Sequence, residues 1–123
     1  RLSELPLCAD ESFTGSENLN EIAESFDIIN IKLMKIGSLV KAKRTIDEAH
    51  KLGLKVMIGC MIESSVAITA GGILSLFSEY SDLDGNLLIS NDPYSGLKLN
   101  TNAEVILPEI EGIGVRSLET EGT

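Results

Sequence analysis

Basic residues are scarce in this chain. The 123 residues include 10 Lys and Arg against 19 Asp and Glu, which gives a formal net charge of −9 at pH 7. Nucleic acids and anionic membrane surfaces bind proteins through basic patches, and an acidic surface repels them. We therefore expect neither as a partner, whereas a divalent cation is compatible with this charge.

Cysteines are also few, and long apolar runs are missing. Cys8 and Cys60 have neither the density nor the spacing of a disulfide framework or a zinc site. This pattern fits a reducing compartment, so we expect a cytoplasmic protein. No apolar run is long enough to span a membrane, and the first residues do not resemble a signal peptide. The chain begins at Arg1 without methionine and soon enters an apolar run, so we expect it to continue a longer polypeptide.

The remaining pattern is a regular alternation of strands and helices. A hydrophobic content of 43% supports one core, and no shift in composition suggests a second. Apolar spacing predicts strands at residues 5–9, 27–33, 55–60 and 80–83, and helices at residues 17–25, between Ser38 and Gly53, and at residues 65–78. Ser16 is the expected N-cap of the first helix. From Gly96 a period of two predicts a hairpin with its turn at residues 100–102.

Two architectures fit this order of elements. Three helices between four strands predict parallel pairing through right-handed crossovers, as in an open doubly wound sheet or in part of a (β/α)8 barrel. No Gly-x-Gly-x-x-Gly loop follows any strand, so the nucleotide-binding form of the open sheet lacks its signature. Charged residues at or just beyond the strand ends favour the barrel, which gathers those ends into one pocket. These residues are Asp10, Lys32, Glu63, Asp82 and Asp84.

Asp10, Glu63 and Lys32 also have a structural interpretation. An aspartate such as Asp10 often begins a turn, and a glutamate followed by two serines, as at Glu63, often opens a helix. A lysine projected from a strand end, as at Lys32, is either paired with a carboxylate or catalytic. Asp82 and Asp84 would share one face of a strand and repel each other, which favours a function with a cation between them.

For two further residues near these strand ends, we expect a structural role. Lys35 is grouped with the lysines of the following helix as part of a solvated face. Cys60 ends its strand and could line the pocket, but a small buried hydrophobic residue is the simpler interpretation.

Four motifs in register resemble the C-terminal half of an enolase-superfamily enzyme, most closely of its muconate-lactonizing-enzyme subgroup. They are residues 7–12 (LCADES), 29–33 (INIKL), 59–65 (GCMIESS) and 82–85 (DLDG). Residues 107–108 and 112–115 resemble the segment that returns to the capping domain of such enzymes. Within the subgroup, the Asp-x-Asp of the last motif is similar to that of the dipeptide epimerases.

The resemblance implies a magnesium-dependent isomerase. Asp10 matches the last of three carboxylate ligands of an essential Mg²⁺. Lys32 matches one of two opposed lysines that move the proton α to a carboxylate through an enediolate. A metal ion suits this chemistry because it stabilises the negative charge of that intermediate.

The resemblance also implies how the substrate is held. Asp82 and Asp84 match a pair that binds the ammonium group of a dipeptide. Cys60, Met61 and Glu63 lie where the seventh barrel strand shapes the substrate pocket. A cycloisomerase or an o-succinylbenzoate synthase of the subgroup is the alternative, since these enzymes share the lysine and the metal but have no reason to keep an ammonium clamp.

Finally, the resemblance implies how the chain is divided into domains. Residues 1–95 would form strands five to eight of a (β/α)8 barrel, residues 96–115 the C-terminal segment of a capping domain, and residues 116–123 a disordered tail. A complete barrel needs about 250 residues. We therefore expect this chain alone to be inactive and to need a missing N-terminal half, with a homo-oligomer as the assembled state. The alternative outside enzymes is an inactive half-barrel that self-associates through its sheet edges.

Overall fold

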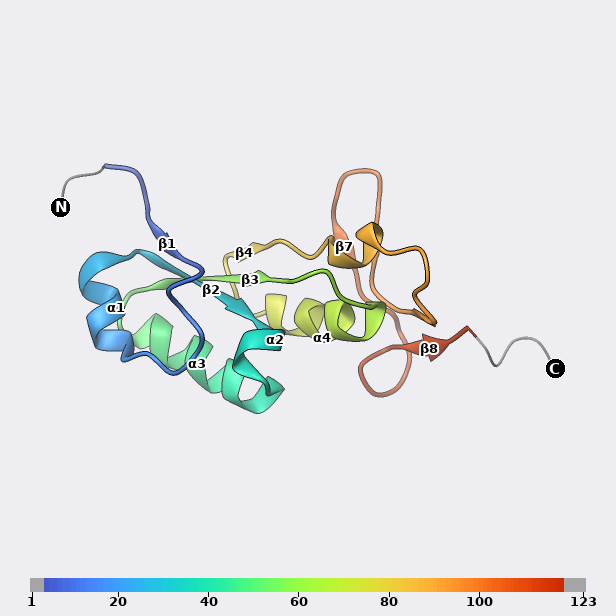
Figure 1. Ribbon diagram of the computed structural model, residues 1–123, viewed down its shortest axis with the longest axis horizontal. Helices are drawn as coiled ribbons and strands as arrows, with labels where there is room; N and C mark the ends of the chain where they lie inside the picture. The colour runs from blue at the N-terminus through green and yellow to red at the C-terminus, as the bar shows by residue number, and fades with distance from the viewer. Residues whose placement is uncertain (1–3, 119–123) are drawn as a thin grey trace.

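The centre of the molecule is a parallel sheet of four strands in sequence order. The computed structural model describes residues 4–118. Its strands β1 (Cys8–Ala9), β2 (Ile28–Lys32), β3 (Lys55–Gly59) and β4 (Tyr80–Ser81) each pair in parallel with the next one along the chain (Figure 1). This arrangement confirms the predicted parallel pairing through crossovers. The register places Lys32 opposite Gly59.

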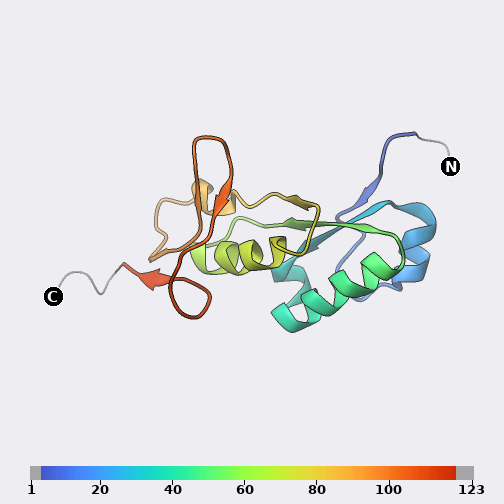
Figure 2. The same cartoon turned by 180° about the vertical axis from the view of Figure 1, so that it is seen from behind.

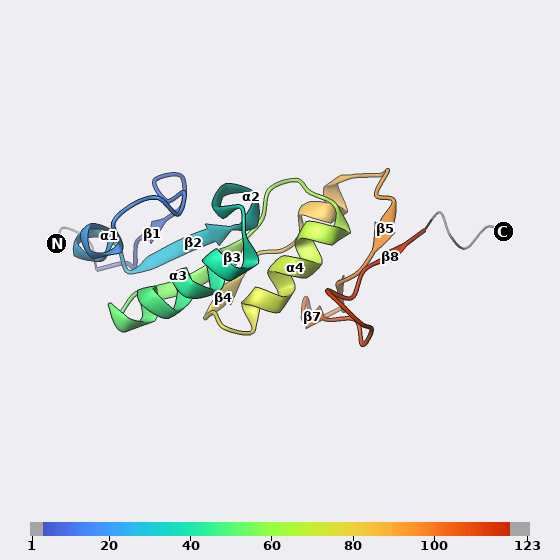
Figure 3. The same cartoon turned by 90° about the horizontal axis from the view of Figure 1, so that it is seen from below.

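Three longer helices connect the strands. They are α1 (Leu19–Ser25), α3 (Leu39–Lys51) and α4 (Ser65–Ser75). Figures 1 and 3 show α3 and α4 on the same side of the sheet. The strand residues Ile29, Ile31, Val56 and Ile58 are buried in the core that these helices share with the sheet. Removal of these branched apolar side chains from water is the main force that holds the helices on the sheet.

The two predicted helix starts differ in outcome. Ser38 is the N-cap of α3, and its Oγ accepts a hydrogen bond of 3.3 Å from a backbone N–H of the first turn, which confirms the predicted start. Ser16 is not the N-cap of α1. Asn18 takes that place, because its Oδ1 accepts a hydrogen bond from the Asn20 N–H at 3.0 Å. The helix therefore begins at Leu19, later than predicted.

Two short helical segments change the predicted strand boundaries. Leu33 begins α2 (Leu33–Ile36), so β2 ends at Lys32 and is shorter than the predicted strand over residues 27–33. Gly37 ends α2 with a φ of 76°, a left-handed conformation that favours glycine. The second segment, η1 (Gly85–Leu88), is a turn of 3-10 helix. It begins directly after Asp84, just beyond the predicted fourth strand.

The C-terminal part forms two small antiparallel strand pairs. β6 (Lys98–Leu99) pairs with β7 (Val105–Ile106), which confirms the predicted hairpin. β5 (Tyr94–Ser95) pairs with β8 (Arg116–Ser117), and Figure 2 shows β8 at the end of the molecule remote from β1. The expected disordered tail from residue 116 is therefore wrong for Arg116 and Ser117, and residues 119–123 lie outside the described residues. None of the described helices is long and apolar enough to cross a membrane.

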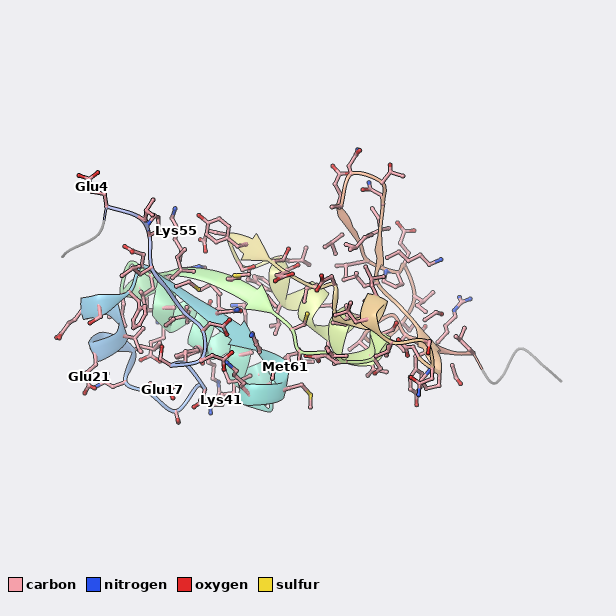
Figure 4. The ribbon with its side chains drawn as sticks, turned by 45° about the horizontal axis from the view of Figure 1, so that its top comes forward. Glu4, Glu17, Glu21, Lys41, Lys55 and Met61 are labelled. Carbon is pink, nitrogen blue, oxygen red and sulfur yellow. The ribbon has the colours of Figure 1, made fainter. Side chains whose placement is uncertain are left out.

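The loop between β1 and α1 is held by one carboxylate. Glu17, labelled in Figure 4, accepts hydrogen bonds from the backbone N–H groups of Thr14 at 2.7 Å, Gly15 at 2.9 Å and Ser16 at 3.1 Å. Partial burial raises the pKa of Glu17, but the hydrogen bonds, with those from Thr14 the strongest, outweigh it and lower the pKa to about 2. Asp10 lies at the start of this loop, so Glu17 helps to fix the chain at the end of β1.

Glu17→Gln is expected to lower the free energy of unfolding by about 1 kcal/mol near neutral pH, because an amide replaces the charged acceptor of three backbone N–H groups. The folded-state pKa lies below the ordinary value of 4.5, so the stabilisation is complete above that value and disappears as the pH falls toward about 2. Urea unfolding across this pH range measures the difference. Glu24→Gln makes the same change of charge at an exposed position of α1 and should have little effect. A difference that does not depend on pH would contradict the assignment.

Candidate active site

The carboxyl ends of the four parallel strands meet along one edge of the sheet. Asp10 directly follows β1, Lys32 is the last residue of β2, and Cys60 directly follows β3. Asp82 directly follows β4, and Met61, labelled in Figure 4, lies just beyond the end of β3. Because neighbouring strands run in the same direction, their carboxyl ends must lie together. The structure thus brings the predicted residues to one edge.

Asp10 and Lys32 form an ion pair across the ends of β1 and β2. The Lys32 Nζ lies 2.9 Å from the Asp10 Oδ1 and 3.2 Å from the Oδ2. The lysine side chain is 12% exposed, whereas the aspartate side chain is 40% exposed. Lys32 is therefore paired with a carboxylate, and that carboxylate is itself a predicted metal ligand.

Lys35 joins this pair, so its expected place on a solvated face is wrong. Its Nζ lies 3.0 Å from the Asp10 backbone oxygen, 3.3 Å from the Asp10 Oδ1 and 3.2 Å from the Glu11 Oε2, and its side chain is 14% exposed. The single turn of α2 places it beside Lys32, because residues three apart on a helix lie on the same face. The Lys-x-x-Lys spacing is the sequence signal for this second lysine.

The four charged residues Asp10, Glu11, Lys32 and Lys35 form what we call the ion cluster. Partial burial raises the pKa of Asp10, but hydrogen bonds from Lys32 and Lys35 outweigh it, so the pKa lies below its ordinary value. The hydrogen bond to Asp10 raises the pKa of Lys32, and desolvation offsets only part of that rise. In this arrangement Lys32 carries a proton at neutral pH. It can donate that proton, whereas accepting one requires its contact with Asp10 to weaken.

The described residues supply part of a metal site. Asp10 offers oxygen ligands of the kind that Mg²⁺ prefers, and its half-exposed carboxylate is accessible to an ion. Among residues 4–118, no group of three His, Cys, Asp or Glu side chains is placed to hold a metal ion. Asp10 therefore fits as one ligand, and the octahedral shell of Mg²⁺ would need further oxygen ligands from other polypeptide, water or substrate.

Asp82 and Asp84, called the acidic pair, lie on the loop after β4, and both are exposed. This loop packs directly on the loop after β3. Gly85 approaches so closely that a methyl group there would overlap the Met61 backbone oxygen, and its N–H donates a hydrogen bond to the Cys60 sulfur. The contact between the two loops places the predicted substrate-binding residues in one group.

Cys60 lies between the acidic pair and the ion cluster, and its electrostatic interactions reach Lys32 on one side and the acidic pair on the other. Burial raises the pKa of its thiol more than the Gly85 N–H lowers it, and the acidic pair and Glu63 raise it further. The thiol is thus protonated at neutral pH and is no nucleophile. Glu63 contributes to the same group, since its Oε1 accepts a hydrogen bond from the Met61 N–H at 2.6 Å.

Asn30 is a buried polar residue that the sequence patterns do not single out as a candidate. It lies two residues before Lys32 on the same face of β2 and is 5% exposed. Its Oδ1 accepts no hydrogen bond from the described residues. The amide lies against Gly59 of β3, where a methyl group would overlap it. The only sequence signal for this contact is one amide among the β-branched residues of β2.

The sequence as a whole matches a known family. The matching family model is described as enolase C-terminal domain-like and covers residues 1–120. This chain belongs to the enolase C-terminal domain-like family. Its parallel sheet is accordingly part of a (β/α) barrel, which confirms the predicted fold class.

Relatives of this enolase C-terminal domain-like chain include curated epimerases. It is 42% identical over 116 residues to the L-Ala-D/L-Glu epimerase of Bacteroides thetaiotaomicron, with 94% of this chain and 30% of that protein covered. It is 43% identical over 110 residues to the hydrophobic dipeptide epimerase of a Flavobacteria bacterium, with 89% of this chain and 31% of that protein covered. The chain therefore spans about a third of the length of these relatives.

Solved structures of dipeptide epimerases share this fold. The TM-score is 0.85 with the enzyme of Cytophaga hutchinsonii in complex with Mg and D-Ala-L-Val, at 27% identity, with 94% of this chain and 33% of that chain covered. The TM-score is 0.80 with the enzyme of Methylococcus capsulatus in complex with Mg and L-Arg-D-Lys, at 34% identity, with 88% of this chain and 32% of that chain covered. About a third of each enzyme thus has the architecture of this chain.

Gly59→Ala should lower the free energy of unfolding by about 1–3 kcal/mol, because the added methyl group overlaps the Asn30 amide inside a packed sheet. Asn30→Ala removes the obstacle, so the double variant should be more stable than the sum of the single effects by at least about 0.5 kcal/mol. Urea unfolding of the four proteins measures this coupling. Strictly additive effects would show that the Asn30 side chain is not the reason why position 59 of β3 requires glycine.

Proposed function

We propose that this chain is the C-terminal part of a magnesium-dependent dipeptide epimerase, with Lys32 as one of its acid/base catalysts. The observation that carries the proposal is the contact between Lys32 and Asp10 at the sheet edge where the acidic pair also lies. Family membership and similarity to curated epimerases support it. Because the chain spans about a third of those enzymes, the activity is proposed for the complete protein and not for this chain alone.

Lys32 is placed to move a proton. With Asp10 as its partner it is an ammonium group and can donate a proton to one face of a substrate carbon. To accept a proton it must be neutral, which requires the Asp10 carboxylate to engage another cation. A Mg²⁺ ion held by Asp10 and further ligands would stabilise the negative charge that develops on the substrate carboxylate. Epimerisation also needs a second acid/base group on the opposite face, which we assign to polypeptide outside this chain.

The acidic pair is proposed to bind the ammonium group of a dipeptide. Leu83 between the two aspartates is buried, which anchors the loop and leaves both carboxylates exposed. Two carboxylates around one ammonium group form charge-assisted hydrogen bonds that offset their mutual repulsion. The enzymes of Methylococcus capsulatus and Cytophaga hutchinsonii hold dipeptides in their structures. We therefore favour a dipeptide over the substrates of a cycloisomerase or an o-succinylbenzoate synthase, and assign Cys60, Met61 and Glu63 to the wall of the same pocket.

The proposed partner of this chain is the polypeptide that supplies the rest of the barrel. β1 and β4 are the edges of the sheet, and Leu7 beside β1 exposes an apolar side chain. Such edges pair with further strands or with another copy of the chain, so homo-oligomerisation through them is the alternative for the isolated chain. Cys8 and Cys60 are free thiols, which supports a cytoplasmic setting.

A chimaeric enzyme tests the assignment of Lys32. In it, this chain replaces the matching part of the Bacteroides thetaiotaomicron epimerase, to which it is 42% identical. We expect the chimaera to exchange the α proton of L-Ala-L-Glu with deuterated solvent only when Mg²⁺ is present, as followed by NMR. Lys32→Met should lower kcat by about 10²- to 10⁴-fold because an acid/base group is lost. Lys41→Met on the exposed side of α3 is the matched control. A folded but inactive chimaera, or one that tolerates Lys32→Met, would contradict the proposal.

Replacement of the acidic pair tests the substrate class. Asp82→Asn combined with Asp84→Asn in the chimaera should raise the KM for L-Ala-L-Glu by about 10- to 100-fold, because charge-assisted hydrogen bonds to the ammonium group are lost. The inhibition constant of N-acetyl-L-Ala-L-Glu, which lacks that charge, should stay nearly unchanged. Glu48→Gln combined with Glu111→Gln removes the same charge from exposed positions and serves as the control. An equal loss of affinity for both compounds would assign the acidic pair a structural role instead.

A further inference from the structure

The first turn of α4 is capped by a residue from a distant loop. Ser64 occupies the N-cap position but makes no side-chain capping hydrogen bond. The Oδ2 of Asp92 instead accepts two hydrogen bonds from Ser65, one from its backbone N–H at 2.6 Å and one from its Oγ at 2.7 Å. The Oδ1 of Asp92 accepts a third from the Tyr94 N–H at 3.1 Å. One carboxylate thus joins the start of α4 to its own loop.

The same serine hydroxyl holds the segment that follows the acidic pair. The Asn86 Nδ2 lies 3.3 Å from the Ser65 Oγ and donates to it. A hydroxyl has one proton and two lone pairs, so giving its proton to Asp92 leaves an acceptor for Asn86. The direction of the chain of hydrogen bonds is thereby fixed, from Asn86 through Ser65 to Asp92. Asn86 belongs to η1, which begins directly after Asp84.

A second link keeps the Asp92 loop on the helix. Thr69, which is fully buried, donates its hydroxyl to the Ser65 backbone oxygen at 2.6 Å and accepts from the Leu97 N–H at 2.8 Å. Gly96 permits this approach, because a methyl group there would overlap the Thr69 hydroxyl. A cavity of about 350 Å³ is lined by Asn86, Ser65 and residues 94–99. The polar connection between η1 and the Asp92 loop therefore passes through Ser65 at the margin of this cavity.

We propose that Asp92 is a positioning residue for the acidic pair, acting through Ser65 and Asn86. The inference rests on the proposed function, in which the acidic pair binds substrate. Both carboxylates of the pair are exposed, whereas Leu83 between them and Gly85 after them are buried, so the placement of the carboxylates depends on what holds this loop on either side. The pairing of β3 with β4 and the buried Leu83 hold the loop before Asp84. Beyond Asp84, the close contact of Gly85 with Met61 and the chain of hydrogen bonds to Asp92 hold it.

The charge of Asp92 suits this role. Partial burial raises its pKa, but hydrogen bonds from Ser65 and from the Tyr94 N–H outweigh it, so the pKa lies below its ordinary value and the carboxylate is ionised. An amide in its place would have one acceptor oxygen for three donors. Asp92→Asn therefore removes at least one hydrogen bond while it keeps the shape of the side chain.

Hydrogen exchange on this chain tests the positioning directly. The Leu87 N–H donates to the Asp84 backbone oxygen at 2.9 Å and reports on the turn that carries the acidic pair. Asp92→Asn, Ser65→Ala and Asn86→Ala should each speed exchange of the Leu87 amide by about 3- to 10-fold, as the loss of one or two hydrogen bonds allows. Ser38→Ala also removes a helix N-cap, but on α3, and should leave this amide unchanged. An unchanged Leu87 rate in Asn86→Ala, which leaves the cap of α4 intact, would overturn the inference.

The chimaeric enzyme supplies the second measurement. Asn86→Ala and Asp92→Asn should raise the KM for L-Ala-L-Glu by about 5- to 10-fold with kcat changed less than about twofold, because ground-state binding alone is loosened. A loss of kcat without a change in KM would overturn the positioning role. If the unaltered chimaera is folded and inactive, the proposed function fails, while the exchange rate of Leu87 still decides whether Asp92 fixes this loop.

Discussion

The register of the parallel sheet is the constraint on which the rest of this structure depends. Side chains along β2 alternate between the helix-covered face and the opposite face. Ile29 and Ile31 are almost completely buried in the core. A slip of one residue would place the Lys32 ammonium in that core, which is energetically prohibitive. The packing of the isoleucines therefore holds Lys32 opposite Gly59 and beside Asp10. The apolar face of β2 thus determines where the charged side chain on its opposite face lies.

The ion cluster is neutral when both lysines carry a proton. Lys32 and Lys35 face the carboxylates of Asp10 and Glu11 at distances from 2.9 to 3.8 Å. A divalent cation at Asp10 would give the cluster excess positive charge and favour loss of a proton from a lysine. Lys35 would keep the Asp10 backbone oxygen at 3.0 Å and Glu11 at 3.2 Å. For Lys32, the nearest remaining carboxylate within residues 4–118 is Glu11 at 3.8 Å. This asymmetry supports Lys32, and not Lys35, as the acid/base group.

The sequence predicts the elements of this fold better than their ends. Apolar periodicity locates the main strands and helices because it determines which faces are buried. The ends depend on contacts that periodicity does not contain: the Ser16 hydroxyl is occupied within its loop, so Asn18 caps α1. The sequence likewise predicts some residues of the candidate site and misses others. Lys32 is found from its place at a strand end, whereas the partners of Lys35 and the close packing of Asn30 come from neighbouring strands and loops.

The start of α4 shows how the segment that follows β4 is joined to this helix. A local cap at Ser64 would cost little chain entropy, yet the cap comes from Asp92, 27 residues beyond Ser65. The larger entropy cost of this distant cap is offset because the Asp92 carboxylate also orders its own loop and because Thr69 holds Leu97 on the helix. The first turn of α4 is thus complete only when the segment after β4 is in place. Since the acidic pair lies within that segment, the interaction that completes the helix also restricts the loop proposed to recognise the substrate.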